Sequence, residues 1–185
     1  MKGYIYKLYK GADPSVGWTF NDPIFGRRKA SLGACMPNIR KAVDIGDWVF
    51  CISGKIKQKA PYIVGGFQVD EKISAIEARL KYPEFNLQRN EEGQVIGNII
   101  VDENGEHHVL DEHDNFGKRK ENYILGRNKV FIESDDSIEE GRKRALDILQ
   151  KTFGRKANRL DDIVPRWRRL DQQQVGILVE ELKKI

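Results

Sequence analysis

Hydrophobic and polar residues alternate along four stretches of the chain, and this pattern predicts strands. The stretches are residues 3–9, 48–53, 62–69 and 122–132. Successive side chains of a strand point to opposite faces, so each stretch presents one apolar face that needs a common core. We therefore expect the four strands to share one curved, mostly antiparallel sheet or a barrel.

Helical periodicity is strongest near the C-terminal end, where helices are predicted over residues 137–153 and 172–184. Both starts have the spacing of a capping box, with Ser or Asp followed three residues later by Glu or Gln. The capping residues are Ser137 with Glu140, and Asp171 with Gln174. A shorter helix is expected to begin at Pro37, since proline suits the first helical turn. Strands first and paired helices last indicate an α+β fold with flanking helices.

The chain has 185 residues, which suits one domain with an appendage. We expect a domain over residues 1–154, followed by a basic linker and an amphipathic helix packed on it over residues 155–185. The two cysteines cannot form a disulfide framework, and no Cys and His residues have the spacing of zinc ligands. No apolar run is long enough to span a bilayer. These features favour a cytoplasmic protein without a membrane, and they imply neither a metal nor a cofactor.

The net charge of +4 is unevenly distributed. Residues 1–60 contain 11 Lys and Arg against 4 Asp and Glu, whereas residues 61–137 contain 9 against 16. Such an asymmetry can direct one face toward phosphate groups, although ordinary surface charge mixed by the fold would also explain it.

The segment 29–53 combines a loop of small residues, a short helix with cations on its outer edge, and a buried strand. Free backbone N–H groups between Cys35 and Asn38 would form an anion site at the start of this helix. Arg40 would add a fixed positive charge. A plain helix-to-strand connection with solvated cations is the alternative.

This segment resembles the second nucleotide-modification-associated domain family. The matching residues are Ala34, Cys35, Pro37, Ile39, Arg40, Gly46, Asp47 and Trp48. The stretch 122–132, with Arg127 in its middle, resembles a later strand of the family. The resemblance implies a role beside enzymes that modify nucleic-acid bases, mainly in phages and bacteria. The family typically has Lys where this chain has Met36, so a phosphate contact from that position is not implied here.

A second resemblance is to PUA-like domains, in which a Gly-Asp turn leads into a strand and a second strand carries Ile-Val-Gly. The corresponding residues are 46–50 and 63–69. The resemblance implies a pocket for a base or modified nucleotide, with glycines that permit close backbone approach.

We expect the ligand, a nucleotide or nucleic acid, to contact nine residues. They are Trp18, Phe20, Arg27, Lys29, Cys35, Asn38, Arg40, Trp48 and Arg127. The cations would meet phosphate, and the aromatic rings would stack on a base. For Trp18, the alternative to ligand contact is that the side chain anchors a loop. For Trp48, the alternative is that it packs in the core.

The leading hypothesis is a binding module, and two others remain open. An enzyme of base modification or nucleotide turnover could use Asp47, Cys35 or the cluster of His and acidic residues at 107–114. No known catalytic signature is present, however, and no histidine lies near Cys35 in the sequence, so we expect Cys35 to be a packed side chain. A protein-interaction adaptor in defence or counter-defence could bind its partner through the apolar stripe at positions 175, 178, 179 and 182.

Overall fold

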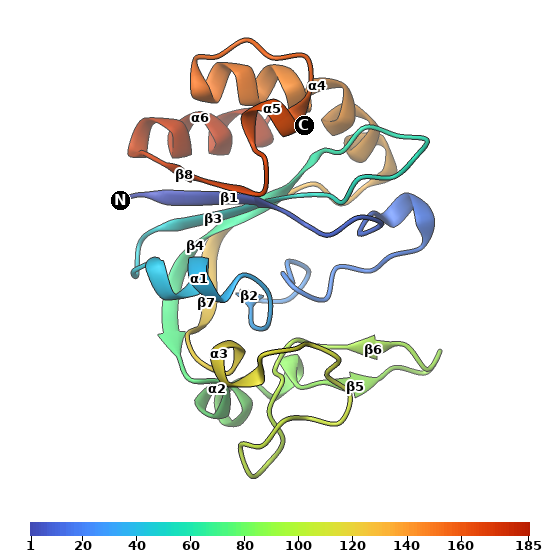
Figure 1. The fold of residues 1–185 in the computed structure, drawn as a ribbon, viewed down its shortest axis with the longest axis vertical. Helices are drawn as coiled ribbons and strands as arrows, with labels where there is room; N and C mark the ends of the chain where they lie inside the picture. The colour runs from blue at the N-terminus through green and yellow to red at the C-terminus, as the bar shows by residue number, and fades with distance from the viewer. The chain divides into compact units, whose positions relative to one another are not determined.

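The computed structural model describes all 185 residues, which form eight strands and six α-helices (Figure 1). The strands are β1 (Gly3–Lys7), β2 (Ala30–Leu32), β3 (Trp48–Ile52), β4 (Ile63–Ile73), β5 (Gln88–Arg89), β6 (Val95–Ile96), β7 (Tyr123–Phe131) and β8 (Trp167–Leu170). The helices are α1 (Pro37–Ala42), α2 (Ala75–Lys81), α3 (Phe116–Arg119), α4 (Asp135–Phe153), α5 (Leu160–Ile163) and α6 (Gln172–Leu182). Two short 3₁₀ turns, Pro14–Val16 and Pro83–Phe85, complete the structure.

The chain divides into two compact units. The first contains residues 1–19, 46–68 and 128–185, and the second contains residues 20–45 and 69–127. Strands β4 and β7 each run from one unit into the other. The predicted division into a domain of residues 1–154 and a C-terminal appendage is not tested by these two units, and it stays a prediction.

In the first unit the strand order is β7-β4-β3-β1-β8. Strands β1 and β3 are parallel, with Gly3 opposite Trp48, while β4 and β8 run antiparallel to their neighbours. Parallel neighbours need a long connection, and about forty residues separate β1 from β3. At the β3–β4 contact, a Cβ on Gly66 would lie 2.2 Å from the ring of Phe50, so the missing side chain allows the ring to pack there.

Helices α4, α5 and α6 lie together on one side of β8, β1 and β3 (Figure 1). Helix α4 begins two residues earlier than predicted, because Ser134 rather than Ser137 caps it, by accepting the backbone N–H of Ser137. The capping box predicted at Asp171 is confirmed. Three of the four residues of the apolar stripe of α6, Val175, Leu178 and Leu182, are buried, and Val179 is half-buried. The adaptor hypothesis therefore loses the surface on which it rested.

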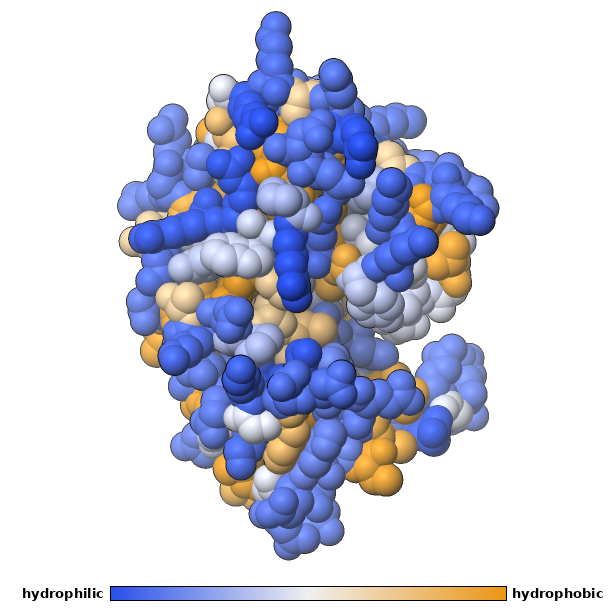
Figure 2. All heavy atoms as spheres, viewed as in Figure 1, coloured by the Kyte–Doolittle hydropathy of each residue, from blue (hydrophilic) through white to orange (hydrophobic).

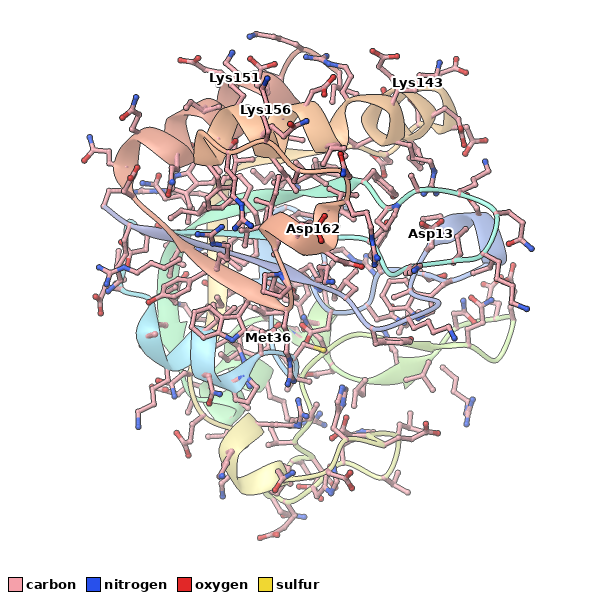
Figure 3. All side chains as sticks on the ribbon, turned by 45° about the horizontal axis from the view of Figure 1, so that its top comes forward. Asp13, Met36, Lys143, Lys151, Lys156 and Asp162 are labelled. Carbon is pink, nitrogen blue, oxygen red and sulfur yellow. The ribbon has the colours of Figure 1, made fainter.

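A buried ion pair ties α4 to the loop that follows β1. Arg142 donates to Asp13 at 2.6 Å and to the Ser15 hydroxyl at 2.9 Å, and both charged side chains are almost inaccessible. Figure 3 shows Asp13 in this loop, whereas Lys143 and Lys151 point outward from α4. Removing one member of such a pair would leave an uncompensated buried charge.

In the second unit, β2 pairs antiparallel with β7, with Ser31 opposite Leu125. Seven buried side chains form the core of this unit. They are Ala75, Ala78, Phe85, Ile99, Val101, Tyr123 and Leu125. A short antiparallel pair, β5–β6, and an isolated antiparallel bridge between Val101 and His107 add to the pairing in this unit.

The predicted α+β class and the mostly antiparallel sheet are confirmed. The barrel alternative is wrong, because β8 in the first unit and β2 in the second are edge strands. A PUA-like fold is not confirmed. No helix combines the length and the apolar character that crossing a membrane requires. Hydrophilic side chains cover most of the face seen in Figure 2, and hydrophobic residues appear there as scattered patches.

Candidate functional site

The loop between β2 and α1 is held by a buried carboxylate, Asp22. Its oxygens accept the backbone N–H groups of Gly33 at 2.7 Å, Ala34 at 2.9 Å and Cys35, and the side-chain amide of Asn98 at 2.9 Å. A carboxylate with several such donors fixes the loop strongly, because hydrogen bonds to charged acceptors are stronger than neutral ones. The N–H group of Cys35 belongs to the predicted anion site, and the chain's own carboxylate occupies it.

Arg40 is fully buried and holds the same loop from its other side. Its three guanidinium nitrogens donate to five backbone carbonyls. The acceptors are those of Cys35 at 2.9 Å, Glu121 at 2.5 Å, Asn122 at 3.0 Å, Ala34 at 3.3 Å and Arg119 at 2.8 Å. Burial lowers the pKa of Arg40 to about 10, so the group is still charged at neutral pH. All five N–H donors of the guanidinium are thus used within the protein.

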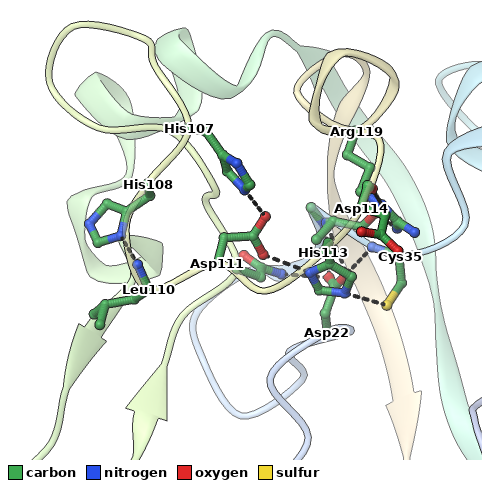
Figure 4. Close-up of polar contacts among 12 residues, drawn as sticks. Asp22, Cys35, His107, His108, Leu110, Asp111, His113, Asp114 and Arg119 are labelled. Atoms are coloured by element: carbon green, nitrogen blue, oxygen red, sulfur yellow. Dashed lines mark hydrogen bonds and ion pairs between the residues drawn. The ribbon is translucent and has the colours of Figure 1, made fainter.

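The fixed loop places Cys35 beside a histidine that is distant in the sequence (Figure 4). The Cys35 Sγ lies 3.8 Å from Nε2 of His113, and Nδ1 of His113 lies 2.6 Å from a carboxylate oxygen of Asp111. The other oxygen of Asp111 lies 2.7 Å from Nε2 of His107. A thiol, an imidazole and a carboxylate therefore stand in line, in the order nucleophile, base and orienting group.

The surroundings of Cys35, His113 and Asp111 shift the pKa of each of these groups. Burial and the nearby Asp22 carboxylate raise the pKa of the Cys35 thiol, so it is protonated at neutral pH. The hydrogen bond to Asp111 raises the pKa of His113. Burial opposes ionisation of Asp111, but hydrogen bonds to His113 and His107 prevail and lower its pKa.

Aromatic rings and cations surround these residues. The ring of His107 stacks on Phe116, with centroids 4.5 Å apart and an interplanar angle of 20°. Lys120 places its Nζ 5.5 Å from the centroid of the Phe116 ring. Arg119 donates from Nε to the Asp114 carbonyl and from Nη1 to the Ala34 carbonyl, both at 2.7 Å, which leaves its Nη2 without a protein partner. We call residues 107–120 the histidine segment.

The structure separates the nine predicted ligand residues into two groups. Trp18 and Trp48 belong to the first unit, and the other seven belong to the second. The Trp18 indole donates to the hydroxyl of Tyr9, and the two rings meet edge to face. Trp48 is buried and stacks on Phe50 at 5.4 Å. Both tryptophans thus have packing roles in the first unit.

Two of the predicted cations in the second unit pair with acidic side chains. Lys29 bonds Asp70 at 2.9 Å and also Glu71, and these partners raise its pKa although burial opposes the shift. Arg127 lies 3.4 Å from Asp70 and is otherwise exposed.

The three remaining residues of the second unit differ in exposure. Arg27 and Asn38 are exposed, and Phe20 is half-buried. Direct contact of any of the nine residues with a ligand stays a prediction.

Sequence reasoning identified Cys35 and the acidic and histidine cluster, but it did not connect them. The signal was present, since His107, Asp111 and His113 stand close together in the chain. The separation of 78 residues between Cys35 and His113 hid the contact. No three His, Cys, Asp or Glu side chains are grouped as a metal ion would require.

Comparison with known protein families matches residues 22–124 to nucleotide modification associated domain 2. The match covers more than half of the chain. The chain belongs to this family. Both the Asp22–Arg40 network and the Cys35–His113–Asp111 line fall within the family domain. No curated protein and no solved structure matches the chain.

Proposed function

We propose that the family domain is a binding module for a nucleotide or a segment of nucleic acid, and that it serves base modification. The family description supports the association with nucleotide modification. The observation that carries the proposal is the combination of stacked rings and cations in the histidine segment, next to the rigid loop of Cys35.

The exposed chemistry of this segment suits both parts of a nucleotide. A half-exposed ring pair, His107 on Phe116, offers a face on which a base can stack, and such stacking contributes about 1–3 kcal/mol per base. Nη2 of Arg119 and the side chains of Lys118 and Lys120 offer donors for phosphate oxygens.

The residues proposed to contact phosphate differ from those expected from the sequence. Arg40 and Lys29 are engaged within the protein. Arg27 is exposed, and the proposal keeps it as an additional contact to the backbone of a longer ligand. Cys35 lies at the edge of the proposed ligand surface, because its loop also supplies the carbonyl that Arg119 contacts.

Fluorescence anisotropy of labelled single-stranded and double-stranded DNA, with unlabelled nucleoside monophosphates as competitors, tests this proposal. We expect Lys118→Glu combined with Lys120→Glu to weaken DNA binding at least tenfold, and Phe116→Ala to weaken binding of both ligand types. Binding of DNA should also weaken as salt is added, because phosphate contacts release counterions.

Lys55→Glu combined with Lys57→Glu is the matched control, since these exposed lysines make the same charge change in the first unit. Equal loss of affinity in both double variants would show that only overall charge matters. Absence of binding to every nucleotide and DNA tested would reject the proposal.

A further inference from the structure

We propose that Cys35 is a catalytic nucleophile that accepts an acyl group from an activated ester or thioester, with His113 as its general base and Asp111 as a positioning residue. This step goes beyond ligand binding and does not depend on the proposed nucleotide site.

Two contacts carry the inference. The thiol and the imidazole are within the distance of a weak S–H···N hydrogen bond, at 3.8 Å. The opposite ring nitrogen lies 2.6 Å from Asp111, whose side chain is only 3% exposed. With Nδ1 carrying the proton toward Asp111, Nε2 is the acceptor that faces the sulfur. A nucleophile next to a base, with the base oriented by a third group, is the arrangement that covalent catalysis requires.

Both reacting side chains are partly exposed to solvent. The side chain of His113 is 38% exposed, and Cys35 is half-buried. Cys51, the other thiol of the chain, is buried in β3. Cys51 can therefore serve as an internal control, because it is a buried cysteine in the same chain.

The charges around the sulfur decide which mechanism is possible. Burial and Asp22 raise the pKa of the thiol, while Arg119 and Arg40 act in the opposite direction without prevailing. The imidazole faces Asp111 and Asp22, which raise its pKa, and Arg119, which lowers it. A resting thiolate–imidazolium pair is therefore disfavoured, and the proton must move to His113 as the sulfur attacks.

The reaction balances without an oxidant or reductant. The sulfur of Cys35 forms a bond to the carbonyl carbon while its proton passes to Nε2 of His113. The tetrahedral intermediate expels the alcohol or thiol leaving group, which takes the proton back from His113, and a thioester remains. Water or an amine then gives a proton to His113 and attacks the thioester, the C–S bond breaks, and the sulfur takes the proton from His113, so the acid or amide leaves and the Cys35 thiol is restored.

The Asp22–Arg40 network has a defined part in this arrangement. It fixes the backbone of residues 33–35 from both sides. The thiol is therefore held in place by bonds that leave the imidazole of His113 free to accept its proton. Such rigid support is what a preorganised nucleophile needs.

Acylation by p-nitrophenyl acetate, a simple activated ester, tests the proposal in the full-length protein. We expect a burst of about one equivalent of p-nitrophenolate per chain, with peptide mass mapping that places one acetyl group on Cys35 and none on Cys51. Cys35→Ser should abolish the burst. His113→Gln should slow acylation by about 10²–10⁴-fold, the usual contribution of general base catalysis.

The pH profile separates catalysis from structure. The acylation rate should fall with decreasing pH as His113 becomes protonated, and Asp111→Asn should shift this limb to lower pH as well as slow the reaction. Circular dichroism should show each variant to be folded. DNA binding by Cys35→Ser, measured in parallel, reports on the binding proposal alone.

Two results would overturn the inference. One is acylation of Cys35 no faster than that of a cysteine peptide of the same local sequence. The other is an unchanged rate and pH profile in folded His113→Gln.

Discussion

Replacing Arg40 tests whether this buried guanidinium is structural or binds a ligand. Arg40→Met removes the charge and all five donors but keeps most of the side-chain volume. Arg40→Lys keeps the charge but supplies only three donors from one point, which cannot match five carbonyls spread around a planar fork.

The hydrogen bonds of Arg40 determine how much unfolding free energy each variant should lose. A hydrogen bond from a charged donor contributes about 1.5–3 kcal/mol, but summing five of them overcounts, since some carbonyls will bond to water in the variant. Each buried carbonyl left without a donor costs about 1–3 kcal/mol, and since some will find water, we expect a total loss of about 3–5 kcal/mol for Arg40→Met. Arg40→Lys should lose about 2 kcal/mol, because roughly half of the hydrogen bonds can be kept. Lys41→Met, an exposed change at the next position of α1, should stay within about 0.5 kcal/mol.

The assay must report on the second unit. All three tryptophans, Trp18, Trp48 and Trp167, lie in the first unit, so their fluorescence is a poor probe of the loop that Arg40 holds. Hydrogen exchange followed by mass spectrometry in a urea series can follow peptides that contain residues 33–35 and 119–123. These amides should lose protection in Arg40→Met at lower urea than in the unmodified chain.

A destabilisation below about 1 kcal/mol in Arg40→Met would refute the argument, because five donors to buried carbonyls could not then be contributing as assigned. Loss of DNA binding with unchanged stability would instead return Arg40 to the role of a phosphate contact.

Three further predictions concern separate features. Gly33→Ala should destabilise the second unit by several kcal/mol in urea unfolding, because its Cβ would lie 2.2 Å from a backbone carbonyl oxygen, whereas Gly26→Ala, with open space around it, should have little effect. Ser134→Ala should cost about 1 kcal/mol in thermal unfolding through loss of the cap of α4, and an unchanged midpoint would contradict that assignment. An NMR titration should place the pKa of His113 above 6.5, and Asp111→Asn should lower it. Since the folded pKa is the higher one, this contact stabilises the protein fully below pH 6.5 and its contribution is lost as pH rises through the folded pKa.

The sequence by itself determined the secondary structure where the pattern was local and regular. Alternation located β1, β3, β4 and β7, and capping spacing located the start of α6. The family resemblance rested on a local motif around Cys35, and the match over residues 22–124 confirms it. These features depend on neighbouring residues, so a linear reading reveals them.

Only the tertiary structure decided which charges are available to a ligand. In the sequence, Arg40 and Lys29 look like phosphate contacts, but the fold buries the first among carbonyls and pairs the second with two acidic side chains. The sequence carries no sign of this, because the acidic partners of Lys29 and three of the five carbonyls around Arg40 come from segments about 40 to 80 residues away.

The same reason explains why the line from Cys35 to His113 was missed. A thiol gains a base only when two distant loops are brought together, and the Asp22 carboxylate and the Arg40 guanidinium do this by fixing one of those loops. Local spacing determines helices and strands, whereas the chemistry of a side chain depends on neighbours that only the folded chain supplies.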